Sequence, residues 1–108
     1  MVEPLRVYVE YRLIPERRQE WQERLRAWQQ QLSRLPVLSY AFYEGVEQPG
    51  VIVEEYQVPD QEAYRRLREE RLAEGSPDAS WQILPCVQGG REKLHVWAFA
   101  PIRLGGSP

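Results

Sequence analysis

Cysteine, histidine and lysine each occur once in the 108 residues, and asparagine and threonine are missing. The single cysteine, Cys86, excludes an internal disulfide framework and fits a reducing compartment, so we expect a cytoplasmic protein. The single histidine, His95, cannot hold a metal ion alone, and the chain offers no HxxxH spacing or second cysteine to assist it. The sequence therefore predicts no metal site and no cofactor.

Long apolar runs and a surplus of positive charge are also missing. No apolar run approaches the ~18–20 residues that a membrane helix needs, and the N-terminus has no signal-peptide layout. Lys+Arg number 14 against 16 Asp+Glu, which argues against a surface for nucleic acid or anionic membranes. Phosphate-binding loops, GxSxG elbows and dinucleotide fingerprints do not occur. What remains is typical of one globular domain, which we place at residues 1–104, followed by a flexible tail at 105–108.

Alternation of apolar and polar residues with a period of two predicts four strands, at residues 5–13, 37–46, 51–58 and 93–102. Segments with helical spacing lie between the first and second strands and between the third and fourth strands. A faint internal repeat, in which Val7 corresponds to Val51 and Pro15 to Pro59, divides the chain into two βαβ halves. Two such halves predict the α+β class: a ferredoxin-like β-α-β-β-α-β sandwich with an antiparallel four-stranded sheet and both helices on one face.

The first helix is expected to begin at Pro15 and to end before Pro36. Its apolar stripe recurs at spacings of three and four residues and should form the helix side of the core: Trp21, Leu25, Trp28, Leu32 and Leu35. The second helix is expected to begin at the N-cap residue Asp60 and to stop at Gly75. Its arginines are expected to lie on a solvated face: Arg65, Arg66, Arg68 and Arg71. A short helical turn carrying Trp81 should follow.

The repeat sets the predicted register and separates the sheet residues into two faces. One set should face the helices: Val7, Val9, Ala41, Val51, Val53, Val96 and Ala98. The other set should lie on the opposite face: Tyr8, Glu10, Leu38, Tyr40, Phe42, Glu44, Ile52, Glu54, Tyr56, His95, Trp97 and Phe99. Nothing else in the chain would cover this aromatic second face, and so large an apolar patch exceeds what a monomer usually exposes. We therefore expect a homodimer, joined sheet to sheet, that encloses a barrel.

Three features resemble a known family: the order of the elements, the Glu54-Glu55-Tyr56 end of the third strand leading into the second helix, and the final His95-Val96-Trp97-Ala98-Phe99 strand. From residue 5 to residue 102 the chain is similar to the dimeric α+β barrel superfamily, which includes antibiotic-biosynthesis-monooxygenase-like, EthD-like and NIPSNAP-like proteins. The resemblance implies a homodimer with a small-molecule pocket between the sheet and the helices of each subunit. Members include cofactor-free oxygenases, haem-degrading enzymes and lyases. Haem-degrading members bind iron through a histidine on the second helix beside an asparagine on the first strand, and this chain has neither residue there.

The candidate site centres on His95, because a histidine side chain titrates near neutral pH and can act as a general base or orient a ligand. The alternative is a half-buried histidine that hydrogen-bonds a carboxylate or the backbone. The last strand should neighbour the first, so the predicted catalytic group is His95 with Glu10 and Tyr8. It should lie beneath the second helix and a lid carrying Trp81. The expected substrate-binding residues are Tyr40, Glu54, Tyr56, Trp81 and Trp97.

Two of the acidic residues on this face have alternative interpretations. Glu10 and Glu54 are equivalent in the repeat and should lie on neighbouring strands, where a buried carboxylate pair could do acid–base work. The favoured alternative pairs them with Arg6, Arg12 or an arginine of a second subunit. The aromatic residues of the face could likewise hold a flat ligand, form the dimer core, or do both.

Two function classes therefore stay open. One is an enzyme that acts on a small aromatic or polyketide-like molecule, as a cofactor-free monooxygenase does. The other is a non-catalytic homodimer that binds a small apolar ligand or has a structural role. RNA binding through the sheet is not expected, because the RNP signature is absent and Glu10 and Glu54 would lie on the binding face.

Overall fold

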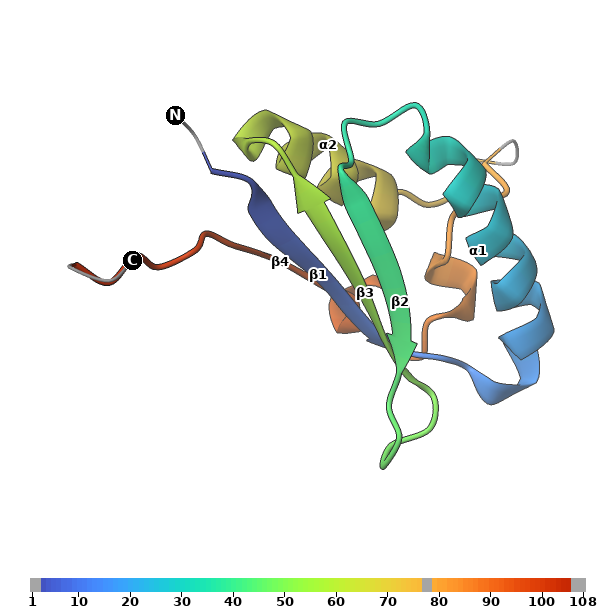
Figure 1. Ribbon diagram of the computed structural model, residues 1–108. Helices are drawn as coiled ribbons and strands as arrows, with labels where there is room; N and C mark the ends of the chain where they lie inside the picture. Colours follow the sequence, from blue (N-terminus) through green and yellow to red (C-terminus); the bar gives the residue numbers. More distant parts are fainter. Residues whose placement is uncertain (1–2, 77–78, 106–108) are drawn as a thin grey trace.

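The computed structural model describes residues 3–76 and 79–105. Six main elements follow one another along the chain: β1 (Leu5–Arg12), α1 (Arg18–Leu32), β2 (Ser39–Glu44), β3 (Val51–Val58), α2 (Gln61–Leu72) and β4 (His95–Phe99). The strands form one antiparallel sheet in the order β2-β3-β1-β4, and both helices lie on the same side of it (Figure 1). This arrangement confirms the predicted α+β class and the predicted ferredoxin-like order of elements.

The ends of the helices follow local signals in the sequence. A 3-10 turn at Pro15–Arg17 leads into α1, because proline fits the first turn of a helix. The side chain of Asp60 accepts a hydrogen bond of 2.9 Å from the backbone N–H of Ala63, which confirms the predicted N-cap of α2. The helix stops at Leu72, short of the predicted end at Gly75.

The segment after α2 differs from its prediction. The expected helical turn carrying Trp81 is absent from the part of it that the structure describes, and a 3-10 turn at Leu84–Cys86 follows instead. A further 3-10 turn at Gly90–Lys93 delays the start of β4, so this strand is shorter than the predicted 93–102. Two pieces of the predicted turn and tail lie outside the described residues: 77–78 and 106–108.

Strand pairing decides which residues face the helices. Val7 lies opposite Tyr56 and Val9 lies opposite Glu54, so these four residues share a face, and Tyr40 of β2 lies opposite Tyr56. The covered face, toward the helices, carries Val7, Val9, Tyr11, Tyr40, Phe42, Glu44, Ile52, Glu54, Tyr56, Val58, Val96 and Ala98. The open face carries Arg6, Tyr8, Glu10, Arg12, Ser39, Ala41, Tyr43, Val51, Val53, Glu55, Gln57, His95, Trp97 and Phe99.

The predicted faces are correct for β1 and β4 and wrong for β2 and β3. Three residues expected against the helices lie on the open face: Ala41, Val51 and Val53. Six residues expected on the opposite face lie on the covered face: Tyr40, Phe42, Glu44, Ile52, Glu54 and Tyr56. The repeat equated Val51 with Val7, whereas Ile52 has the inward orientation. Because side chains alternate along a strand, this shift of one position reverses the face of every residue.

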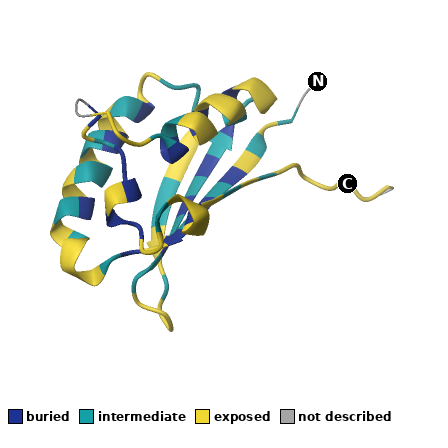
Figure 2. Ribbon diagram, turned by 180° about the vertical axis from the view of Figure 1, so that it is seen from behind, coloured by how far each residue is buried: buried dark blue, intermediate teal, exposed yellow. Residues whose placement is uncertain are grey.

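Both helices bury one stripe against the covered face. Trp28 is fully buried, and replacing such a ring by alanine costs about 3–5 kcal/mol. The rest of the predicted α1 stripe is buried or packs against the core: Trp21, Leu25, Leu32 and Leu35. The buried residues of α2 are Ala63, Leu67, Arg71 and Leu72. Exposed residues lie along the outer surfaces of both helices (Figure 2). The predicted helix side of the core is therefore confirmed.

No element of the described chain covers the open face (Figure 1). Three aromatic side chains are exposed on it, with exposed fractions of 54% for Tyr43, 45% for Trp97 and 52% for Phe99. Val51 and Val53 of β3 are half-buried on the same face, opposite Arg12 and Glu10 of β1. Within the described residues, no helix is long and apolar enough to span a bilayer.

Candidate functional site

The residues predicted to form one site are divided between the two faces of the sheet. The open face brings together Tyr8, Glu10, His95 and Trp97. The covered face holds Tyr40, Glu54 and Tyr56, with Trp81 beside it in the connection after α2. The division follows from the register of β2 and β3, which the sequence did not reveal.

On the open face, Glu10 and His95 are direct partners across the β1–β4 pair. Side chains in this relation have their Cβ atoms about 4.5–5.5 Å apart, so the carboxylate can reach the imidazole. The imidazole stacks on the indole of Trp97 with a centroid distance of 5.4 Å and an interplanar angle of 5°. This confirms the predicted adjacency of β1 and β4 and gives the face one flat aromatic surface beside a carboxylate.

The same pair borders a hollow of about 530 Å³ at the end of the sheet. It is lined by Glu10, Tyr11, Arg12, Gln48, Val51, Gln88, Gly89, Lys93 and His95. This volume lies within the range of small-molecule sites, which begins near 300 Å³. The hollow is open to solvent, and its lining combines apolar surface with polar side chains, so a bound ligand would stay partly exposed.

Tyr8 is the third residue of the predicted catalytic group, and its hydroxyl has another partner. It donates a hydrogen bond of 2.9 Å to Glu55, whose other carboxylate oxygen lies 3.6 Å from Arg6. The hydrogen bond to Glu55, with a smaller contribution from desolvation, raises the pKa of Tyr8 above its ordinary value. Tyr8 lines a second hollow, of about 500 Å³, together with Phe99. The first hollow therefore contains His95 and Glu10 without Tyr8.

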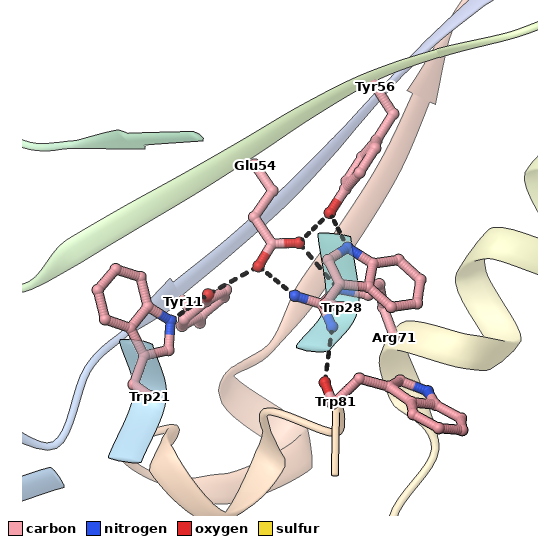
Figure 3. Close-up of polar contacts among 7 residues, drawn as sticks. All are labelled: Tyr11, Trp21, Trp28, Glu54, Tyr56, Arg71 and Trp81. Atoms are coloured by element: carbon pink, nitrogen blue, oxygen red, sulfur yellow. Dashed lines mark hydrogen bonds and ion pairs between the residues drawn. The ribbon is translucent and has the colours of Figure 1, made fainter. Parts of the chain in front are cut away.

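On the covered face, the carboxylate of Glu54 is fully buried and accepts four hydrogen bonds (Figure 3). Arg71 of α2 donates two of them, from Nε at 2.8 Å and from a terminal nitrogen at 2.5 Å. The hydroxyls of Tyr11 and Tyr56 donate the other two, at 2.7 and 2.5 Å. A carboxylate offers about four acceptor positions, so this one is saturated.

Two tryptophans of α1 extend this buried network. Trp21 donates its indole N–H to the hydroxyl of Tyr11 at 2.8 Å, and Trp28 donates to the hydroxyl of Tyr56 at 2.6 Å. The guanidinium of Arg71 lies over the Trp28 ring, 4.1 Å from its centroid. No buried side-chain nitrogen or oxygen in the described part of the chain lacks a hydrogen-bond partner. We call these six residues the Glu54 network: Tyr11, Trp21, Trp28, Glu54, Tyr56 and Arg71.

Burial and charge both act on the Glu54 network. Desolvation raises the pKa of Tyr11 and Tyr56 well above 10.0, and the nearby charge of Glu54 raises it further. For Arg71, burial opposes the charged form, but the charge and hydrogen bonds of Glu54 outweigh it and raise the pKa. Near neutral pH the two tyrosine side chains are therefore neutral and the guanidinium of Arg71 is charged.

Two predictions about charged residues need correction. Glu10 and Glu54 lie on neighbouring strands but on opposite faces, so they do not form a carboxylate pair. Glu54 does pair with an arginine, as the favoured alternative held, but the partner is Arg71, which was expected in solvent and is fully buried. The sequence feature that indicates burial of Arg71 is its spacing, because Ala63, Leu67 and Arg71 recur every four residues on one side of α2.

Trp81 also lies elsewhere than predicted. Its indole N–H donates to Glu70 of α2 at 3.1 Å, and its backbone carbonyl accepts from Arg71 at 3.3 Å. Both contacts tie it to the helix side of the molecule, and Figure 3 shows the one with Arg71. It cannot act as a lid over His95, because His95 lies on the other side of the sheet. Among the described residues, no group of three or more His, Cys, Asp or Glu side chains could hold a metal ion.

Several solved structures share this architecture. A conserved protein from Methanosarcina mazei Go1 has a TM-score of 0.68 at 15% identity, covering 91% of this chain and 92% of its own. Rv0793 from Mycobacterium tuberculosis has a TM-score of 0.65 at 21% identity, covering 96% and 100%. A protein provisionally named an antibiotic biosynthesis monooxygenase, from Bacteroides thetaiotaomicron VPI-5482, has a TM-score of 0.65 at 19% identity, covering 98% and 96%. The fold is that of the antibiotic biosynthesis monooxygenase-like proteins.

At these identities the likeness shows the fold alone. No protein-family model matches the chain, and no curated protein matches its sequence. The family resemblance seen in the sequence implied a small-molecule pocket between the sheet and the helices. In this chain the side chains of the Glu54 network occupy the space between β3, α1 and α2, with every polar atom paired. The open-face hollow at His95 and Glu10 is therefore the candidate functional site.

Proposed function

We propose that this protein is a homodimer, joined through its open sheet faces, that binds a small aromatic molecule at the hollow bordered by His95 and Glu10 and oxidises it without a cofactor. The observation that carries the proposal is the strand register that places a histidine directly opposite a glutamate across β1 and β4, at a hollow of ligand size. The monooxygenase name of similar structures gives the reaction class.

The dimer part of the proposal rests on the uncovered sheet. Tyr43, Trp97 and Phe99 expose apolar rings on one face, and a second copy of the chain supplies an equally flat and apolar partner. Two sheets pack about 10 Å apart with their side chains interleaved. The hollow at His95 lies toward one end of the sheet, so it would open at the mouth of the barrel rather than at its centre.

The chemistry follows from the groups on the hollow. A neutral imidazole can take a proton from an acidic phenol or enol, and the carboxylate of Glu10 stabilises the imidazolium that forms. The resulting electron-rich ring supplies the electrons that reduce molecular oxygen. One oxygen atom enters the ring to give a quinone and the other leaves as water, so no external reductant is needed. Trp97, stacked on His95, holds the imidazole plane and offers an apolar wall.

Oxygen consumption with 1,8-dihydroxyanthrone, which carries acidic C–H and phenolic groups on a flat ring system, tests the proposal. His95→Ala should lower kcat by about 10²-fold or more if the imidazole is the general base. Glu10→Gln should lower kcat by a smaller factor, and Glu47→Gln, in the exposed β2–β3 hairpin, should leave the rate unchanged. Equal rates for the wild type and His95→Ala would overturn the enzymatic assignment.

A second candidate function is a non-catalytic dimer that binds a small ligand. The observation that favours it is the Glu54 network, which fills the interior of the sandwich with side chains that are already saturated. Binding of the anthrone with no oxygen consumption above the buffer rate would support this candidate. The cytoplasmic location and the absence of a cofactor stay predictions.

A further inference from the structure

Two cationic side chains, Arg12 and Lys93, lie at the hollow beyond the Glu10–His95 pair. Six arginines of the described residues form ion pairs with carboxylates: Arg6, Arg17, Arg18, Arg24, Arg71 and Arg103. Arg12 and Lys93 have no carboxylate partner within residues 3–76 and 79–105. The only acidic side chain on the hollow is Glu10, so the lining has two fixed positive charges against one negative charge.

The fold brings these two cations together from segments far apart in the sequence. Arg12 ends β1, and its backbone carbonyl accepts a hydrogen bond of 2.8 Å from the N–H of Gln88. Leu13 forms a bridge with Val87, so the segment leading to Lys93 is fastened to the end of β1. Both side chains are exposed and remain free to turn toward a ligand.

Gly89 shapes the position of Lys93. Its φ of 85° lies in the left-handed region that favours glycine, and the aliphatic stem of Lys93 lies directly against it. A side chain at position 89 would collide with that stem. The absence of a side chain at position 89 therefore leaves room for the Lys93 stem beside the turn at Gly90–Lys93, next to the hollow that both residues line.

We propose that the hollow selects an aromatic carboxylate, with the ring against His95 and the carboxylate between Arg12 and Lys93. This inference rests on the proposed function, because it names the substrate class of the same site. An arginine binds a carboxylate through two parallel N–H donors, and a lysine adds a point charge that can follow the ligand. Glu10 repels an anion, but it lies beside His95, on the ring side of the hollow, whereas the cations lie beyond it.

Isothermal titration of the homodimer with naphthalene-2-carboxylate and with its neutral isostere, naphthalene-2-carboxamide, tests the charge preference. The carboxylate should bind at least about tenfold more tightly than the amide at low ionic strength, and added salt should reduce the difference. The double variant Arg12→Gln/Lys93→Gln should remove the preference, because it should weaken binding of the carboxylate far more than binding of the amide. The control Arg66→Gln/Arg68→Gln changes the net charge equally on the exposed side of α2 and should keep the preference.

Lys93 also allows a direct test, because it is the only lysine of the chain. Reductive methylation with ¹³C-formaldehyde gives one ε-amine product, which NMR separates from the terminal amine. Naphthalene-2-carboxylate should slow methylation of Lys93 several-fold, and the amide should not.

Equal affinities for the two probes, or no protection of Lys93 by the carboxylate, would overturn the carboxylate proposal. If both probes bind equally and His95→Ala weakens both, the site at His95 stands and only the substrate class is wrong. If neither probe binds, or if His95→Ala leaves the binding of both unchanged, the proposed site itself is wrong.

Discussion

The two faces of one sheet treat polar side chains in opposite ways. On the covered face, Glu54 and Arg71 are fully buried and every polar atom around them is paired. On the open face, His95 and Arg12 are exposed, and Glu10 is only half-buried. A saturated buried group has no capacity left for a ligand, whereas exposed groups beside a hollow have it. The covered face therefore carries polar side chains that stabilise the fold, and the open face carries polar side chains that are available to bind a ligand.

The largest expected effect comes from breaking the buried pair. Arg71→Met should lower the free energy of unfolding by about 3–5 kcal/mol, because Glu54 keeps its charge in a buried place without a counter-charge. Urea unfolding measures this loss. Adding Glu54→Gln to Arg71→Met should recover part of it, since the neutral amide removes the unpaired charge and its oxygen still accepts from one of the two tyrosines. No recovery would mean that the packing of Arg71 on Trp28, rather than its charge, stabilises the fold.

The second largest effect is expected at alkaline pH, which should lower the free energy of unfolding through the buried tyrosines of the covered face. Burial raises the pKa of Tyr11 and Tyr56 above 10.0, so their contribution to stability is complete below pH 10 and is lost as the pH rises above it. Each tyrosine should reduce the free energy of unfolding by about 1.4 kcal/mol per pH unit above 10. Urea unfolding at pH 9, 10 and 11 measures the slope. Absorbance of tyrosinate at 295 nm should lag behind the titration of the unfolded chain; simultaneous titration of all tyrosines in the folded protein would contradict the prediction.

A substitution on the open face should change the oligomeric state of the protein more than the stability of the single chain. Trp97→Asp places a charge in the proposed dimer interface and should give a monomer in sedimentation velocity. Because Trp97 is 45% exposed in the single chain, the variant should unfold at nearly the same urea concentration as the wild type diluted until it is monomeric, since dimerisation itself stabilises the folded chain. Val46→Asp, in the exposed hairpin, is the matched control and should stay dimeric. A wild-type monomer at micromolar concentration, or a dimeric Trp97→Asp variant, would argue against the interface.

The smallest effect is expected at an exposed ion pair with similar geometry. Arg18 donates two hydrogen bonds to Glu44, at 3.1 and 2.5 Å, and thereby lowers the pKa of that carboxyl. The two side chains are 42% and 34% exposed, so solvent screens the interaction. Arg18→Gln should change the free energy of unfolding by less than about 1 kcal/mol. A loss as large as that of Arg71→Met would show that burial is not what distinguishes the two pairs.

Sequence periodicity was enough to predict the order of the elements, because long stripes such as Trp21 to Leu35 and the N-cap Asp60 are local signals. It was not enough to orient β2 and β3. At Val51, Ile52 and Val53 three apolar residues follow one another, so alternation does not identify the inward side. Which face is buried depends on pairing with β1, a contact between distant parts of the chain.

The candidate site was predicted in part for the same reason. The meeting of Glu10 and His95 followed from strand order alone, since β1 and β4 had the correct orientation. The Glu54 network was missed because its members come from four elements, and an arginine in a charged helix looks solvated unless its spacing is compared with that of Ala63 and Leu67. The hollow at Lys93 was missed because this residue was expected to begin the last strand, whereas it ends the 3-10 turn Gly90–Lys93.

The saturation of the Glu54 carboxylate also constrains how this chain can diverge. Its hydrogen bonds come from three separate elements, and two of the donors are themselves bound by tryptophans of a fourth. Replacing Tyr11 or Tyr56 alone leaves a buried indole N–H without an acceptor, and replacing Arg71 alone leaves a buried charge unpaired, so these one-step changes are selected against. Descendants should therefore keep the set intact or exchange several members together for apolar residues, whereas folding places no such constraint on the exposed Arg12 and Lys93. Substitutions are therefore expected to occur together within the Glu54 network on the covered face and independently of one another on the open face.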